Sequence, residues 1–319
     1  MNASINIDIV IPVFNGEAHI LECLKSIDSQ KLYQTYKINI IAVDDSSTDK
    51  SYEYLKSHTG NTRLKIIQHS ENKGRSSTIN TGVKAGSAPF IIILDCDCQW
   101  QTPHALHDLI NPLLQYGKIA CFGLTTSSYH DSGFWARYLK DVCHERKSGK
   151  IRNQTTANFS ITRTALVKIG YFSNHYHSYG FEDRDLISRL VSEYGDQNMI
   201  VASDCIATHT TNGLTVKSMG EKFYAAGKES SVIFFKQHPE AYREAVYAKF
   251  DAEFISNVSR SLLKLTIPLS SAFIFFLDFT ISNSLLPYLI TKYLVKSALA
   301  ISYFKGTLDR KSNIFKEHD

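Results

Sequence analysis

The chain lacks the features that would place it among disulfide-stapled, zinc-binding or nucleic-acid-binding proteins. Its 319 residues include six cysteines, and no two of them form a CxxC pair. No second Cys/His pair follows at zinc-site spacing, so the cysteines are expected to be reduced thiols. The 35 basic residues barely outnumber the 31 acidic ones, which is too small an excess to indicate a nucleic-acid partner.

A targeting segment and a long hydrophobic run are also missing. The N-terminal sequence MNASINIDIVIPVF has neither the basic region nor the small-residue cleavage site of a signal peptide, so a cytoplasmic location is expected. The two most apolar uncharged runs, residues 265–277 and 279–291, have 13 residues each. Roughly 18–20 are needed to span a bilayer, so a spanning segment is not expected.

The first part of the chain alternates between short apolar runs and helical periods. Near-continuous apolar runs, as in a parallel sheet covered on both faces, predict strands at 7–13, 38–43, 64–68, 90–94 and 118–124. Helical periods lie between them near 17–29, 47–58, 75–86 and 103–116. This series predicts a doubly wound α/β sheet that binds ligands at the carboxyl ends of its strands. After residue 125 polar loops dominate, a helix is predicted at 181–195, and the chain is helical from about 217.

Two pairs of acids follow strands of this sheet. Asp44 and Asp45 end the second strand, where a carboxylate can bind a base imide or a ribose hydroxyl, although one of them can instead cap the next helix. Asp95 and Asp97 end the fourth strand. Acids at this spacing can hold a divalent cation whose shell a diphosphate completes, although a lone DxD also occurs in surface turns. In this context the pattern predicts a Mn²⁺ or Mg²⁺ site.

Charged residues at two helix starts are further candidates. Lys73, Gly74 and Arg75 lie where a helix N-terminus favours anions, or they form a solvated basic turn. Glu182 and Asp183 are favourable first-turn residues in their own right. One of them can also accept the proton of an attacking hydroxyl.

His209 is a candidate third metal ligand. It comes 26 residues after Asp183 and just past a predicted short strand. Imidazole binds Mn²⁺, but a single histidine is also commonly a hydrogen-bonded loop residue, and the sequence leaves both readings open.

The tail combines apolar runs with basic residues. Between residues 260 and 316 there are eight basic residues and two acidic ones. Apolar faces bordered by basic residues are typical of helices that lie in an anionic membrane interface. The alternative is a helical pair that packs on the rest of the chain or on another subunit.

Five segments together resemble family 2 glycosyltransferases with the GT-A fold: IVIPVFNGEAHILECLKSI, VDDSSTDKS, ENKGRSSTINTGVKAG, ILDCDC and YGFEDRDLISRL. They occur in family order and cover roughly residues 5–215. The resemblance implies a GT-A catalytic domain over 1–215, with a nucleotide-sugar half to about 125 and an acceptor half over 126–215. A helical, membrane-apposed region over 216–319 would follow.

The resemblance also implies a reaction and its donor-binding residues. A sugar would move with inversion from a nucleotide-diphosphate sugar to a hydroxyl of a glycan or lipid-linked glycan, as in bacterial envelope polysaccharide assembly. Together with the missing signal peptide, the basic, apolar tail suggests that the enzyme works on the cytoplasmic face of the inner membrane. Pro12, Phe14 and Glu17 would lie beside the nucleotide, and Asp44 or Asp45 would read its base.

The metal and catalytic roles follow in the same way. Asp97, with Asp95 nearby, would hold the metal-diphosphate, and His209 would be a further metal ligand. The family usually places the catalytic base on the second acid of its ED pair, hence Asp183. Glu182 would then bind acceptor or sugar hydroxyls.

Three departures and two rival functions remain. Ser46 replaces the glycine of the usual DDGS turn, Cys98-Gln99-Trp100 follows the DxD, and Tyr179-Gly180-Phe181 replaces a double glycine. A sugar-phosphate nucleotidyltransferase would need a GxGxR-type loop after the first strand, which the sequence lacks. A catalytically inactive sugar-binding or scaffold subunit would be expected to have lost the acids, which are all present. Oligomerisation through the C-terminal helices is also possible.

Overall fold

The structure is a computed structural model that describes residues 4–31, 36–60, 62–211 and 213–310. The chain forms two compact units that are interleaved along the sequence. The first contains residues up to 131, 139–174 and 186–210, and the second contains 132–138, 175–185 and the chain from 211 onward. The division into functional domains at residues 125 and 215 stays a prediction of the sequence.

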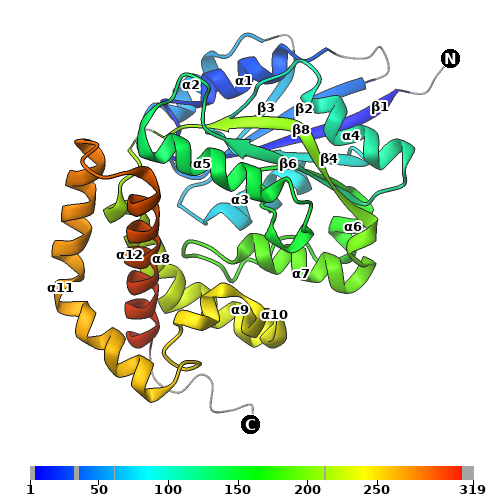
Figure 1. The fold of residues 1–319 in the computed structure, drawn as a ribbon. Coiled ribbons are helices and arrows are strands. Elements are labelled where there is room, and N and C mark those ends of the chain that lie inside the picture. Colours follow the sequence, from blue (N-terminus) through cyan, green and yellow to red (C-terminus); the bar gives the residue numbers. More distant parts are fainter. Residues whose placement is uncertain (1–3, 32–35, 61, 212, 311–319) are drawn as a thin grey trace. The chain divides into compact units, whose positions relative to one another are not determined.

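An eight-stranded sheet forms the centre of the first unit, in the order β3-β2-β1-β4-β7-β6-β8-β5 (Figure 1). β7 is antiparallel to β4 and β6, β5 is antiparallel to β8, and the other neighbours are parallel. The predicted α/β fold with a mostly parallel sheet is confirmed. The strands are β1 (Ile5–Val13), β2 (Tyr36–Asp44), β3 (Arg63–Gln68), β4 (Phe90–Leu94), β5 (Cys98–Trp100), β6 (Ala120–Thr126), β7 (Asn158–Thr162) and β8 (Met199–His209).

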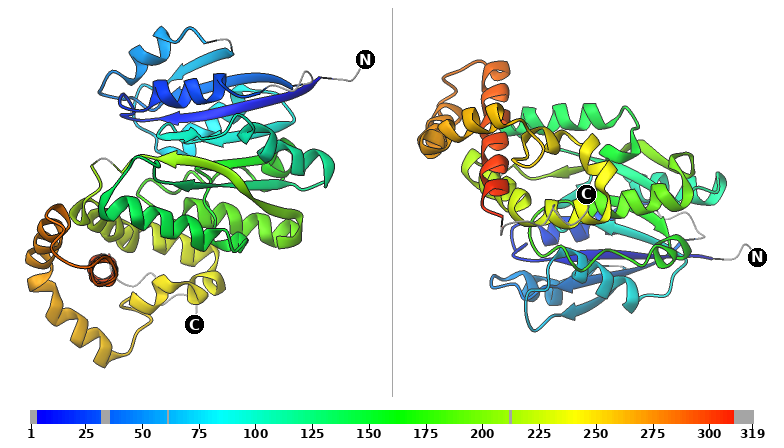
Figure 2. Two further views of the ribbon diagram at one scale, coloured as in Figure 1. Left: turned by 45° about the horizontal axis from the view of Figure 1, so that its top comes forward. Right: turned by 90° about the horizontal axis from the view of Figure 1, so that it is seen from below.

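Helices cover both faces of this sheet (Figures 1 and 2). Because side chains alternate along a strand, Ile7, Ile9 and Ile11 of β1 enter one core cluster and Val10 enters the other. The first cluster is closed by α1 (Ile20–Asp28), α2 (Ser51–Ser57) and α4 (Ala105–Gln115). The second is closed by α3 (Arg75–Ala85), α6 (Arg163–Lys168) and the part of α7 (Glu182–Tyr194) that belongs to this unit. Burial on both faces explains the continuous apolar strand sequences.

Several elements between residues 95 and 210 were not expected from the sequence. β5 has three residues, β7 has five, and α5 (Gly133–Arg146) had no clear apolar period. β8 runs for 11 residues and contains His209, so the predicted short strand before this histidine is a long one. Its pairing with β6 skips from Ala202 to Ile206, which leaves polar Ser203 and Asp204 outside the ladder. Because of this irregularity, the sequence of β8 has no regular alternation of apolar and polar residues from which the strand could be predicted.

The second unit is helical, as the sequence from 217 predicted. Its helices are α8 (Val216–Ala225), α9 (Ser231–Gln237), α10 (Pro239–Glu244), α11 (Asn257–Ser282) and α12 (Tyr288–Leu308), with short helical turns at Ala226–Ser230 and Val246–Phe250. An aromatic core includes Phe181, Tyr242 and Tyr303. Beside it, Arg310 Nη2 lies 2.8 Å from Asp251 Oδ2, and both side chains are almost fully buried.

Glycines let α12 lie very close to α8 and to the helical turn Ala226–Ser230 that follows it. A Cβ at Gly306 would lie 2.1 Å from the carbonyl oxygen of Tyr224, and one at Gly227 would lie 2.4 Å from that of Tyr303. The two backbones are therefore in direct contact at this crossing, and larger residues would separate them.

α11 differs from what the two 13-residue runs suggested. Asp278 does not break the helix, because its carboxylate turns to α8 and accepts hydrogen bonds from Val216 N at 2.6 Å and Lys217 N at 3.1 Å. The resulting 26-residue helix is long and apolar enough to cross a membrane by length and composition, and 11% of its most apolar window is buried. Figure 2 (left) looks along α12, with α11 beside it. The exposed apolar residues on α11, called its outer face below, are Val258, Leu262, Leu265, Leu269, Phe275, Phe276 and Phe279.

Candidate active site

The candidate donor residues of the first unit meet at one edge of the sheet. β2, β1 and β4 are neighbouring parallel strands, and Val13 pairs with Asp44 in the register of β1 and β2. The carboxyl ends of parallel strands point to the same edge, so Pro12, Asp44 and Asp95 lie along it. The structure thus brings these predicted residues together.

Asp45 holds the turn that precedes α3. Its carboxylate accepts hydrogen bonds from Lys73 N at 2.9 Å and Gly74 N at 2.8 Å, and Nδ1 of His69 lies 2.7 Å from it. Gly74, with φ of +81°, occupies the N-cap position of α3. The backbone N–H groups of Lys73 and Gly74, which were expected to bind an anion, therefore already donate to Asp45.

Asp44 is differently placed, although it is the adjacent residue. Its side chain is fully buried, and one oxygen accepts a hydrogen bond from Gln68 Nε2 at 3.2 Å. The other oxygen, Oδ1, has no hydrogen-bond partner among the described residues. A buried carboxylate oxygen without a partner is costly, and a ligand N–H or O–H would satisfy it. Of the two acids, Asp44 is thus the one with a carboxylate oxygen that no described residue satisfies.

The loop after β1 is tied to the loop after β2. Glu17 Oε2 accepts from Lys50 N at 2.9 Å, and Glu17 N donates to Asp49 Oδ2 at 3.0 Å. Phe14, at the loop's start, is half exposed, which leaves its ring available to a ligand. Ser46 has a φ of +61°, so it occupies the left-handed conformation for which the usual glycine is suited.

Asp97 and His209 face each other across the β5–β8 pair. Cys98 of β5 pairs with His209 of β8, and Asp97 Oδ2 lies 3.0 Å from His209 Nε2. Both side chains are about one-third exposed. Two ligands at right angles on one Mg²⁺ or Mn²⁺ ion, each about 2.1 Å from it, would be about 3 Å apart, so the two side chains are close enough to share one divalent cation in place of their mutual contact. The strand pairing, which the sequence did not predict, is what places His209 there.

The same contact shifts the pKa values of both groups. Burial acts to raise the pKa of Asp97, but the hydrogen bond and the charge of His209, with His19 adding to them, hold the pKa below its usual range. Burial acts to lower the pKa of His209, but Asp97 raises it above the ordinary value. The pair therefore favours an ionised carboxylate. His19 was not among the predicted residues, and no sequence signal marked it.

Asp95 is engaged differently from Asp97. Its Oδ1 accepts from Arg75 Nη2 at 2.8 Å and Nε at 3.1 Å, and Arg75 also contacts Thr156 Oγ1 at 3.2 Å. Arg75, expected to face a phosphate, thus spans from the start of α3 to the DxD segment. Across the described part of the chain, no three His, Cys, Asp or Glu side chains gather in a metal-binding group. Of the three predicted ligands, Asp97 and His209 are the pair in contact.

In the second unit, the ED pair lies in the first turn of α7. Glu182 and Asp183 are both partly buried. The preceding turn is strained: Gly180 has φ of +90°, and Phe181, with φ of +72°, adopts a conformation that is rare for a bulky residue. The Phe181 ring packs against Phe234 with 5.2 Å between centroids, which anchors this turn in the aromatic core.

A buried pair that sequence reasoning missed fixes the same turn of α7. Asp185 is fully buried, and its Oδ1 lies 2.9 Å from Nε2 of His238. His238 ends α9 and begins α10, and its ring lies 5.1 Å from that of Phe234. Asp185 lies two residues after Asp183 in the same EDRD segment, but nothing in the sequence indicated its partner.

A protein-family model matches most of the first unit. The model described as glycosyl transferase family 2 matches residues 8–205. Glycosyltransferase AglE of Haloferax volcanii is 26% identical over 180 residues, which are 54% of this chain and 58% of that protein. Dolichol-phosphate mannosyltransferase of Pyrococcus furiosus is 27% identical over 114 residues, 36% and 32% of the two chains. The matches thus span less than two-thirds of these relatives.

Solved structures share the fold. Mannosyltransferase PcManGT of Pyrobaculum calidifontis, in complex with GDP-Man and Mn²⁺, has a TM-score of 0.64 and 16% identity over 97% of this chain and 89% of that one. TarS 1–349 of S. aureus, in complex with UDP, has a TM-score of 0.55 and 14% identity over 95% and 90% of the two chains. These similarities establish the GT-A fold.

Proposed function

The chain belongs to glycosyltransferase family 2, and we propose that it moves a sugar with inversion from a nucleoside-diphosphate sugar to an acceptor hydroxyl. The observation that carries the proposal is the arrangement along one sheet edge of the first unit. There Asp44 Oδ1 is buried without a hydrogen-bond partner among the described residues, and Asp97 Oδ2 lies 3.0 Å from His209 Nε2. PcManGT and TarS, which share the fold, bind GDP-Man and UDP.

We assign donor binding to residues of this edge. Asp44 Oδ1 accepts a hydrogen bond from the base, Phe14 and Pro12 flank the nucleotide, and Glu17 and Asp45 hold the loops that frame it. Asp97 and His209 would hold Mn²⁺ or Mg²⁺, which supplies positive charge to the leaving diphosphate. Asp95, with Arg75 on its carboxylate, borders the same segment.

The catalytic base in this proposal is Asp183. Direct displacement needs one group that takes the proton of the acceptor hydroxyl as its oxygen attacks the anomeric carbon. Asp183 stands in the α7 turn that Phe181 and Asp185 anchor, so its backbone is held in place. Glu182 beside it would bind acceptor or sugar hydroxyls.

The test of this mechanism combines donor binding, turnover and stereochemistry. Purified protein is screened against UDP-, GDP-, dTDP- and CMP-sugars with and without Mn²⁺, and release of the free nucleotide is then followed with candidate acceptors. Asp183→Asn should lower turnover about 10²–10⁴-fold and leave donor affinity nearly unchanged. Asp196→Asn, an exposed carboxylate after α7, is the control. Near-normal turnover of Asp183→Asn, or retention of the donor's anomeric configuration, would contradict the mechanism.

We further propose that the acceptor is lipid-linked and that α11 rests on the cytoplasmic surface of an anionic membrane. Large apolar side chains are exposed along the outer face of α11, and Lys264 and Lys296 are exposed on α11 and α12. Lys311 and Lys316, two of the eight basic residues between 260 and 316, lie outside the described residues. All six cysteines are free thiols, consistent with a reducing compartment.

Point substitutions test this membrane contact better than removal of residues 260–319. Truncation would delete Tyr303 and Arg310, which belong to the buried core of the second unit. Changing Leu262, Leu265 and Leu269 together to Gln should abolish sedimentation with phosphatidylglycerol vesicles and leave the melting temperature unchanged, because these side chains are exposed. Undiminished sedimentation would refute the contact.

A further inference from the structure

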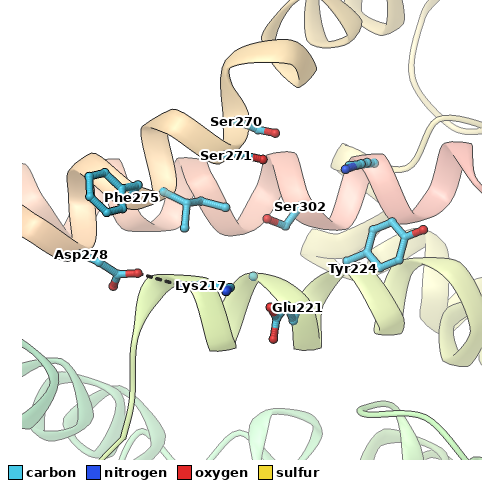
Figure 3. A pocket seen from close by; sticks show the side chains of 11 residues that line it. Lys217, Glu221, Tyr224, Ser270, Ser271, Phe275, Asp278 and Ser302 are labelled. Atoms are coloured by element: carbon cyan, nitrogen blue, oxygen red, sulfur yellow. Dashed lines mark hydrogen bonds between the residues drawn. The ribbon is translucent and has the colours of Figure 1, made fainter.

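The helices α8, α11 and α12 of the second unit surround a cavity of about 550 Å³ (Figure 3). This volume lies within the range of roughly 300–1,000 Å³ that small-molecule sites occupy. Two of its walls meet at Gly220 of α8 and Ser302 of α12, since a Cβ on Gly220 would lie 3.0 Å from Ser302 Oγ. The donor and metal residues all belong to the first unit, so none of them lines this cavity.

The α11 side of the cavity includes an apolar part that continues into the outer face of α11. Ile274 and Phe275 line it, and Phe275 is 75% exposed. The same phenyl ring thus borders the cavity and belongs to the apolar surface proposed to contact a membrane. A hydrocarbon chain that enters the cavity would therefore keep continuous apolar contact with the lipid beyond it.

The other two helices, α8 and α12, each contribute one lysine to the lining. Lys217 at the start of α8 and Lys305 near the end of α12 are exposed, and within the described ranges neither has a carboxylate at ion-pair distance. Of the two acids in the lining, Asp278 is already bound to two backbone N–H groups of α8. Glu221, one turn after Lys217, remains able to accept a hydrogen bond (Figure 3).

These features define the ligand by its chemistry. Two ammonium groups bind a phosphate, a carboxylate accepts from a hydroxyl, and an apolar wall holds a chain. We propose that the cavity binds the phosphate headgroup of a membrane lipid, with the phosphate at the lysine-bearing helices α8 and α12 and the hydrocarbon chain along Ile274 and Phe275. This site deepens the proposed function, because it would hold the lipid phosphate that carries the acceptor.

The experiment measures binding of dodecyl phosphate below its micellar concentration to the full chain by titration calorimetry. Inorganic phosphate and dodecyl maltoside supply the headgroup and the chain separately. Dodecyl phosphate should bind with one-to-one stoichiometry and at least about tenfold more tightly than either. Equal affinity for inorganic phosphate would indicate a simple anion site, equal affinity for the maltoside would indicate apolar adsorption, and either result would overturn the proposal.

Two variants locate the site. Lys217→Gln/Lys305→Gln should weaken dodecyl phosphate binding at least tenfold, whereas Lys264→Gln/Lys296→Gln, which removes two exposed lysines outside the cavity lining, should not. Ser271→Trp places an indole at an exposed position of the lining and should block binding without disturbing the core. Full binding by both cavity variants would refute the site.

Failure of this inference is distinguishable from failure of the proposed function. Stabilisation by the nucleotide-sugar donor reports on the first unit and should be unchanged in Ser271→Trp and in the double lysine variant. If the donor stabilises the wild type but dodecyl phosphate does not bind, the lipid-phosphate site is wrong and donor binding stands.

Discussion

Replacing Asp44 by Asn should change donor affinity and stability in opposite directions. The side chain of Asp44 is fully buried, and its Oδ1 has no partner among the described residues. If the base N–H donates to this oxygen, the bond is charge-assisted and contributes about 1.5–3 kcal/mol. Asn presents an N–H or a weaker acceptor there, so the dissociation constant of the donor should rise about 10–150-fold.

Without donor, the same substitution should stabilise the protein. Asn removes a buried carboxylate whose one side-chain partner among the described residues is Gln68, and an unpaired neutral amide is less costly to bury than an unpaired carboxylate. We expect a gain of about 1 kcal/mol, which corresponds to roughly 2 °C in melting temperature for a chain of this size.

Asp45→Asn is the matched comparison. The Asp45 carboxylate binds Lys73 N, Gly74 N and His69, so its replacement should destabilise the protein by about 2–4 kcal/mol. Scanning fluorimetry measures the stability of both variants, and calorimetric titration measures their donor affinity. The reasoning is refuted if Asp44→Asn binds donor within threefold of wild type, or if it melts several degrees lower.

Three further substitutions test other parts of the structure. His209→Asn should weaken Mn²⁺ binding at least tenfold in a metal titration, because it removes one of the two side chains of the Asp97–His209 pair. His130→Asn, at an exposed histidine, is the control, and unchanged affinity of His209→Asn would place the metal elsewhere. Ser46→Gly should raise the free energy of unfolding by up to about 1 kcal/mol in urea, because Ser46 has φ of +61°, and a loss would show that this conformation is not strained. Gly306→Ala should lower the free energy of unfolding by about 3 kcal/mol, because the new Cβ would lie 2.1 Å from the carbonyl oxygen of Tyr224. Ser297→Ala, at an exposed position of α12, is the control, and a loss below about 1 kcal/mol would mean that α8 and α12 separate easily.

Local patterns were enough to predict the framework of the first unit. Continuous apolar runs predicted β1, β2, β3, β4 and β6, and the acids at strand ends predicted that Asp44 and Asp95 share one edge of the sheet. These inferences hold because a strand buried on both faces needs apolar residues throughout, and because parallel strands end at one edge. Gly195, with φ of +76°, ends α7 as predicted for a glycine stop.

Residues that depend on distant pairing were beyond this reasoning. Asp44 and Asp45 are indistinguishable in sequence, and only the position of the 69–74 turn gives Asp45 its donors and leaves Asp44 with a free oxygen. Arg75 was expected at a phosphate, but the fold places it on Asp95. His238 carried no signal, because its partner Asp185 is 53 residues away.

The sequence by itself therefore determined the fold class, the strand ends and the chemical types of the candidate residues, since these follow from periodicity and from residue chemistry within a few positions. Tertiary structure alone decided which of these residues meet. A three-residue strand, β5, sets Asp97 against His209, and one carboxylate, Asp278, turns inward so that α11 continues through it and keeps its apolar face outward. Such contacts join segments far apart in the chain, and their free energy depends on the packing of the whole unit rather than on any local pattern.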